Sequence, residues 1–356
     1  MDLNILWFII VAFLFAGYFL LEGFDFGVGM LLPFLGGKDR EERAERRTAA
    51  IKSIGPVWDG NEVWLITAGA VIFAAFPEWY ATMFSGFYLP LLLILLALIM
   101  RGVGLEWRSK VETQRWRDLC DLGTSIGSWL PALLWGVAFA NILRGVPIDA
   151  DRQIESGLTG LLGLLNPYGL LGGLTFVLLF MLHGAMFLGF KTADPLRTRV
   201  HEIGRKWLTV PTVLVVFAFS LWTQNAHGRP ETWWAVAVLG VTVILGISAL
   251  ARGRDGWAFA ATCLTVLALA VQLFGSLFPE LMPTTLADGV SLDIYNSASS
   301  EYTLTFMSWA MLFLMPPVLL VQGWTYWIFR KRIRVEAHPP EEEPHRTAQP
   351  VTAAQG

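Results

Sequence analysis

The stretch Ile5–Phe26, ILWFIIVAFLFAGYFLLEGFDF, decides the class of this protein. It is long enough to cross a membrane, since a spanning helix needs about 20 mostly apolar residues. The composition of the whole chain agrees, with 54% hydrophobic and only 15% charged residues and a mean hydropathy of +0.53. A typical soluble domain has about 25% charged residues. The sequence therefore predicts an integral membrane protein.

Eight further stretches have the same character, so the fold class predicted is all-α with about nine transmembrane helices. The nine predicted spans are Ile5–Phe26, Ile54–Phe76, Thr82–Val103, Leu122–Leu143, Pro167–Phe190, Trp207–Ala226, Thr232–Leu250, Trp257–Phe278 and Leu304–Phe329.

The basic residues predict the orientation of these spans. If the N-terminus lies outside, all but three of the 26 Lys and Arg residues fall on the inner side. The exceptions are Arg144, Arg152 and Arg229. Because cytoplasmic loops are enriched in Lys and Arg, this bias favours nine crossings, with the N-terminus outside and the C-terminus in the cytoplasm.

The remaining organisation is simple. Residues 1–330 are predicted to form one transmembrane domain, and the charged, proline-rich residues 331–356 a disordered cytoplasmic tail. The net charge of −3 argues against binding nucleic acid. Cys120 and Cys263 fit neither a disulfide framework nor a metal site, and no cleavable signal peptide is expected.

Four carboxylates lie at the inner ends of the first two spans: Glu22, Asp25, Asp59 and Glu62. Within each pair the acids are three residues apart and so share one helix face. Ionisable groups inside a membrane are costly and are usually functional. The apolar neighbours of these acids favour burial, in which case they pass protons, hold a cation, or pair with Arg101.

Two alternatives stay open at this point. The acids would also fit a hydrated position in the headgroup zone, although their apolar neighbours favour burial. His183 is the only histidine inside a predicted span, so a pair of axial haem ligands within this chain is not expected. A single axial ligand and a hydrogen-bonded packing histidine both fit His183, and the second is favoured.

Several motifs in order along the chain resemble subunit II of the cytochrome bd-type quinol oxidases. The motifs are Glu22-Gly-Phe-Asp-Phe-Gly-Val-Gly29, Trp58-Asp-Gly-Asn-Glu-Val-Trp-Leu-Ile-Thr-Ala68, Phe84-Ser-Gly-Phe-Tyr88, Arg108-Ser-Lys110, Gly136-Val-Ala-Phe-Ala-Asn141, Leu165-Asn-Pro-Tyr-Gly169 and Phe278-Pro-Glu-Leu-Met-Pro283. The similarity runs to about Arg330.

The resemblance implies a subunit of a respiratory, electrogenic quinol:O2 oxidoreductase in the bacterial cytoplasmic membrane. The partner, subunit I, would hold two haems b and one haem d, and subunit II would resemble it in architecture. Small single-helix accessory subunits occur in the family, and some members bind a structural quinone in subunit II. Ubiquinol and menaquinol are both open as donors, and so is the cyanide-insensitive subclass.

The resemblance also implies that subunit II gives structural support and part of the cytoplasmic proton path. The family's path aspartates match Asp25 and Asp59, while relatives vary at the positions of Glu22 and Glu62. Trp58, Asn61 and Arg101 are expected to support these acids. A different function class, a stand-alone proton- or cation-coupled transporter, would also place carboxylates beside glycine-interrupted helices.

Overall fold

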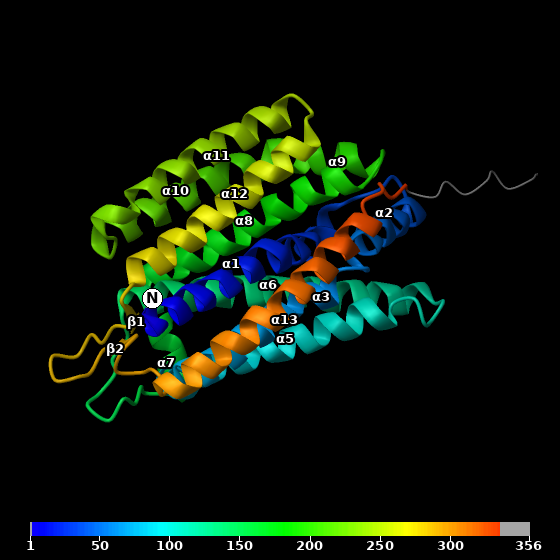
Figure 1. Cartoon of the computed structure of the whole chain (residues 1–356). Helices are drawn as coiled ribbons and strands as arrows, with labels where there is room; N and C mark the ends of the chain where they lie inside the picture. Colours follow the sequence, from blue (N-terminus) through cyan, green and yellow to red (C-terminus); the bar gives the residue numbers. More distant parts are fainter. Residues whose placement is uncertain (1, 335–356) are drawn as a thin grey trace, which may run out of the picture.

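A computed structural model describes residues 2–334 and shows long helices packed side by side in one bundle (Figure 1). Eight helical segments among these residues are long and apolar enough to cross a membrane. They contain α1 (Leu3–Leu31), α5 (Tyr88–Trp107), α6 (Gln114–Arg144), α8 (Pro167–Lys191), α10 (Thr209–Ala226), α11 (Trp233–Ala251), α12 (Asp255–Leu277) and α13 (Glu301–Ile328). The predicted all-α membrane fold is confirmed.

The second predicted span forms the helix α3 (Trp58–Ala75), which packs along α1 but is not among these eight segments. It is shorter and less apolar because Asp59, Asn61 and Glu62 occupy its first turns. Gly55 and Pro56 separate it from α2 (Arg40–Ile54), so it begins later than predicted. The count of nine crossings and the sidedness stay predictions.

The helices form two groups of four, and each group is made of helices that follow one another along the chain. This repeat is not visible in the sequence alone. The first group contains α1, α3, α5 and α6, and the second contains α8, α10, α11 and α12 (Figure 1). In each group the first helix leads into a short helix at the same end of the bundle, α2 in one and α9 (Leu196–Ile203) in the other. Helix α13 lies against α1 and α3.

The two groups meet along α8, which packs against both α6 and α1, and glycines bring α1 and α8 close together. A Cβ atom on Gly27 would lie 1.9 Å from the carbonyl oxygen of Phe180 and 2.8 Å from the Cα of Gly184. Only glycine therefore fits at this crossing.

Shorter elements lie at the two ends of the bundle. At one end are the N-terminus, α7 (Gly157–Leu164) and a two-stranded antiparallel sheet of β1 (Glu280–Met282) and β2 (Leu292–Asp293), in which Glu280 pairs with Asp293 (Figure 1). The third predicted span is divided, because α4 (Pro77–Gly86) ends before α5 begins at Tyr88. The remaining turns are η1 (Leu32–Phe34), the π-turn η2 (Gly204–Leu208) and η3 (Pro230–Thr232).

The chain after α13 returns to the second helix group at the opposite end. Arg332 donates to Asp255 at 2.8 Å, and the backbone N–H of Ile333 donates to the carbonyl of Lys191 at 2.9 Å. The first residues of the predicted tail are therefore packed against the bundle. Residues 335–356 of that tail lie outside the described residues.

Candidate functional site

An ion pair is buried between the first and third predicted spans. Glu22 on α1 and the guanidinium of Arg101 on α5 are in direct contact, and both side chains are shielded from solvent. The guanidinium also lies 5.0 Å from the ring centroid of Phe26, a cation–π distance. Gly127 on α6 leaves room for Arg101, because a Cβ atom there would lie 2.6 Å from that of Arg101. The predicted pairing of an acid with Arg101 is thus formed by Glu22.

Asp25, one turn further along α1, is held by a short chain of amide and phenol groups. Its Oδ2 accepts a hydrogen bond from Nδ2 of Asn61 on α3 at 2.7 Å. The Oδ1 of Asn61 accepts in turn from the hydroxyl of Tyr326 at 2.7 Å and from Nε2 of Gln322 at 3.1 Å. Asp25 and Asn61 are both fully buried. Three helices, α1, α3 and α13, are therefore linked through the side chain of Asn61.

Several buried polar atoms around these two acids have no hydrogen-bond partner among the described residues. They are the Tyr18 hydroxyl, Glu22 Oε2, Asp25 Oδ1, Arg101 Nε and Nη2, Thr124 Oγ1 and Trp135 Nε1. Tyr18, Glu22 and Asp25 follow the i, i+4, i+7 spacing of one helix face. Buried polar groups ordinarily find a partner, and internal water is the usual one. This face of α1 is therefore polar enough to carry a chain of hydrogen bonds.

The sequence predicts that the acids of α3 are buried, and the structure does not bear this out. Asp59 is exposed in this chain and Glu62 is half-buried, whereas Asn61 between them is fully buried. The reason is the rotation of α3: its buried residues Asn61, Ala68 and Ile72 form one stripe against α1. Asp59 lies in the first turn of the helix, away from that stripe. The side chain of Trp58 is near α5: a Cβ atom added to Gly102 would lie 3.6 Å from its ring.

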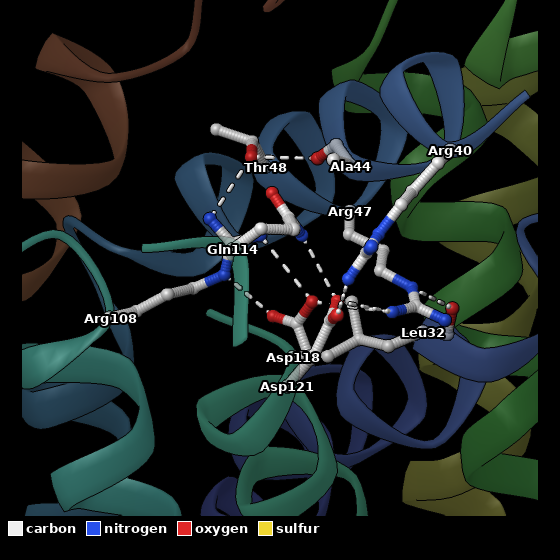
Figure 2. A network of polar contacts seen from close by, with 9 residues as sticks. All are labelled: Leu32, Arg40, Ala44, Arg47, Thr48, Arg108, Gln114, Asp118 and Asp121. Atoms are coloured by element: carbon white, nitrogen blue, oxygen red, sulfur yellow. Dashed lines mark hydrogen bonds and ion pairs between the residues drawn. The ribbon is translucent and has the colours of Figure 1, made fainter. Parts of the chain in front are cut away.

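A second polar network, which the sequence does not single out, joins α2 to the α5–α6 connection (Figure 2). Arg108 donates to both oxygens of Asp121, at 2.6 and 3.4 Å, and to the hydroxyl of Thr48 at 3.0 Å. Arg47 lies 3.5 Å from Asp121 and 3.7 Å from Asp118. In the sequence, the basic residues at this end of the bundle indicate only the orientation of the chain. In the structure, they also hold α2 across that end.

The start of α2 is fixed by its own side chains. Asp39 accepts from the backbone N–H of Glu42 at 2.8 Å, as an N-cap residue does. The backbone N–H of Lys38 and the side chain of Arg46 donate to Glu42, at 2.7 and 2.6 Å, and these bonds hold the pKa of Glu42 below its usual value. Glu42 is therefore ionised at neutral pH and stays paired with Arg46.

His183 on α8 uses both ring nitrogens in hydrogen bonds. Nε2 lies 3.0 Å from the carbonyl oxygen of Leu20, and Nδ1 lies 2.8 Å from the hydroxyl of Thr262. A carbonyl only accepts, so Nε2 carries the proton. The single proton of the Thr262 hydroxyl then has two acceptors within reach, Nδ1 of His183 and the carbonyl oxygen of Phe259 at 2.9 Å. The imidazole also stacks on Phe259 at 5.1 Å. These contacts are those of a packing histidine.

Other polar side chains of the second helix group are also paired with one another. Ser220 donates to Gln272 at 2.6 Å, and the hydroxyls of Thr242 and Thr265 are 2.9 Å apart. Within residues 2–334, no group of three or more His, Cys, Asp or Glu side chains could hold a metal ion. The unpartnered atoms around Glu22 and Asp25 lie in the first helix group. In the second group, the buried hydroxyl of Ser276 on α12 is also without a partner among the described residues.

An apolar groove of about 590 Å³ opens beside this cluster. It is lined by residues of α3, α4 and α5, among them Tyr80, Phe84 and Leu95, with Phe15 and Trp135 also contributing. The groove and the polar face of α1 are therefore neighbours, since the ring centroids of Trp135 and Tyr18 lie 6.0 Å apart.

Known proteins match this chain over nearly its whole length. The family described as cytochrome bd terminal oxidase subunit II matches residues 3–329. Cytochrome bd ubiquinol oxidase subunit 2 of Bacillus subtilis (strain 168) is 42% identical, over 93% of this chain and 97% of the relative. Cytochrome bd-I ubiquinol oxidase subunit 2 of Escherichia coli (strain K12) is 36% identical, over 94% and 96%.

A solved structure agrees in fold. A chain of the bd oxidase from Geobacillus thermodenitrificans superposes with a TM-score of 0.69 at 18% identity, over 92% of this chain and 97% of that one. The match to the family profile spans nearly all of the transmembrane domain, and both curated relatives are covered almost end to end. This chain belongs to the cytochrome bd terminal oxidase subunit II family.

Proposed function

We propose that this chain, as subunit II of a cytochrome bd quinol:O2 oxidoreductase in the bacterial cytoplasmic membrane, supports the complex and carries part of the proton path from the cytoplasm. Reduction of one dioxygen to two waters consumes four protons, so a site within the membrane needs a route for them. The comparisons give no support to the transporter alternative.

The observation that carries the proposal is the state of the Asp25 carboxyl group. One oxygen is held by Asn61, and the other has no partner among the described residues. A proton carrier needs such an arrangement: one oxygen fixes the geometry, while the other takes up and releases the proton. Arg101, which pairs with the adjacent Glu22, is the positive charge in the same interior.

The order of the path follows from burial. Exposed Asp59 and half-buried Glu62 lie at the start of α3 and would receive protons from water. Asp25, fully buried, would take them next, and the polar face of α1 continues from Asp25 to Glu22 and Tyr18. Trp58 and Asn61 would shape the entrance, with Asn61 in direct contact with Asp25.

The redox groups belong to the partner in this proposal. Subunit I would hold the two haems b and the haem d, and the two subunits would form a heterodimer, with or without small single-helix accessory subunits. Both nitrogens of His183 already have partners, which supports placing the haems outside this chain.

A structural quinone, where one is bound, would fit the groove between α3, α4 and α5. The groove is apolar and bordered by aromatic rings, which suits an isoprenoid tail. Replacing Leu95 by Trp would fill it, and we then expect less quinone in organic extracts of the purified complex. Unchanged quinone content would argue against this placement.

The decisive experiment on the proton path is oxygen consumption per haem in an intact complex that carries Asp25→Asn. This substitution keeps the size of the side chain but removes the proton that it exchanges. Slow turnover with normal haem spectra is the expected result, and wild-type turnover would refute the path.

A further inference from the structure

Helix α13 is packed lightly, and its polar contacts lie at two places. Many of its large side chains are exposed, including Phe306, Phe313 and Leu320. Near its start, the indole Nε1 of Trp7 lies 3.2 Å from the carbonyl oxygen of Leu304 and from the hydroxyl of Ser308. Near its end, its side chains bind Asn61 on α3.

The contact near the end of α13 is made by two residues that share one helix face. Gln322 and Tyr326 are four residues apart, and both donate to Oδ1 of Asn61. A carbonyl oxygen has two lone pairs, so these two donors use its full accepting capacity. With the oxygen fixed toward α13, the amide nitrogen of Asn61 must point the other way, toward Asp25.

We propose that Gln322 and Tyr326 are positioning residues of the proton path and that they act through Asn61 on Asp25. This inference rests on the proposed function of Asp25. Asn61 donates an N–H to Oδ2 of Asp25, so that oxygen is occupied and the exchangeable proton is carried by Oδ1. Helix α13 thereby determines which of the two carboxyl oxygens takes part in proton transfer.

The consequence of losing these donors follows from the amide itself. A free asparagine amide can turn by half a rotation and present its oxygen to Asp25. That oxygen accepts, so it favours a proton on Oδ2 of Asp25 rather than on Oδ1. The same proton is then held between Asp25 and Asn61, away from the polar face of α1. Proton transfer slows, although no residue of the path has been removed.

Infrared difference spectroscopy on the intact oxidase complex tests this proposal. The carboxyl C=O band of Asp25 is assigned by its loss in Asp25→Asn. In the wild type, the C=O oxygen is Oδ2, whose hydrogen bond from Asn61 lowers the stretching frequency. In Tyr326→Phe/Gln322→Leu we expect this band at a higher frequency, together with turnover reduced by about tenfold, as expected when a reacting group is misplaced.

Tyr302→Phe is the matched control. It makes the same substitution near the start of the same helix, at a side chain that is 81% exposed. We expect an unchanged carboxyl band and unchanged turnover. The single variant Tyr326→Phe keeps the ring and removes only the hydroxyl, so it provides the same readout if the double variant assembles poorly.

The possible results separate this proposal from the one on which it rests. An unchanged Asp25 band in Tyr326→Phe and in the double variant overturns the positioning role. A shifted band in these variants, with wild-type turnover in Asp25→Asn, would instead show that α13 orients Asp25 but would refute the proton path.

Discussion

Glu22 on α1 and Arg101 on α5 form an ion pair from which solvent is excluded, although 79 positions separate them in the sequence. Removing two charges from water is costly, and their attraction offsets that cost only while both are present. The stability of this buried site therefore depends on both residues.

Arg101→Leu tests this dependence. The substitution leaves Glu22 without its partner and should cost about 3–5 kcal/mol of stability. Glu22→Leu/Arg101→Leu replaces the pair by apolar side chains, which is often close to neutral. We expect the single variant to lose its haem spectrum at a lower temperature than the double variant. Equal midpoints for the two variants would show that the pair is not coupled.

The crossing of α1 and α8 predicts a second effect on stability. Gly27→Ala places a methyl group 1.9 Å from the carbonyl oxygen of Phe180, so the helices must separate. Overpacking of this kind costs about 1–3 kcal/mol. We expect less assembled complex and a lower thermal midpoint. Gly323→Ala on α13, where no atom lies within 4 Å, is the control and should resemble the wild type.

His183→Ala tests whether this chain ligates haem. Both ring nitrogens are in hydrogen bonds with protein groups, so the reduced-minus-oxidised spectrum should keep all its band positions. The two hydrogen bonds of the ring would be lost, at a cost of about 0.5–1.5 kcal/mol each, because Thr262 keeps its bond to the Phe259 carbonyl. A lower thermal midpoint should therefore accompany the unchanged spectrum. Loss of one haem band from an assembled complex would identify His183 as a ligand.

The orientation of the chain is open to labelling from outside intact cells. Cys120 and Cys263 are first replaced, and a single cysteine is then introduced at Ala287 or at Glu112, both of which are exposed. The distribution of Lys and Arg places residue 287 outside and residue 112 in the cytoplasm. An impermeant maleimide should label only the cysteine at 287. Equal labelling at both positions would contradict the orientation and, with it, the cytoplasmic entrance.

Much of the fold could be predicted from the sequence, because spans and loop charges are local properties. The acids of α1 and the pairing of an acid with Arg101 could also be predicted from the sequence. The prediction that Asp59 and Glu62 are buried is wrong, because apolar neighbours in the sequence do not show which face of a helix is turned inward. The stripe Asn61, Ala68 and Ile72 would have shown that Asn61 faces α1.

Other parts of the site depend on contacts that no local pattern encodes. Tyr326 and Gln322 reach Asn61 across more than 260 positions of sequence, and nothing near either end predicts that meeting. Asp118 and Asp121 were missed for another reason. Their arginine partners, on α2 and directly after α5, also fit the orientation signal, which explained them without an ion pair.

The last prediction ranks the two aspartates that the resemblance places in the proton path. Asp25 is fully buried between α1 and α3, whereas Asp59 is exposed in this chain and has the half-buried Glu62 three residues away. Water and Glu62 can therefore deliver protons when Asp59 is lost, but the described residues offer no such substitute next to Asn61. Asp25→Asn should lower oxygen consumption per haem by about tenfold or more, within the range that loss of a proton-transferring group produces. Asp59→Asn should have a smaller effect, and Asp59→Asn/Glu62→Gln should approach that of Asp25→Asn. Oxygen uptake by purified complexes with matched haem content is the measurement. Equal, wild-type turnover in all three variants would mean that protons reach the oxygen site by a route outside these helices.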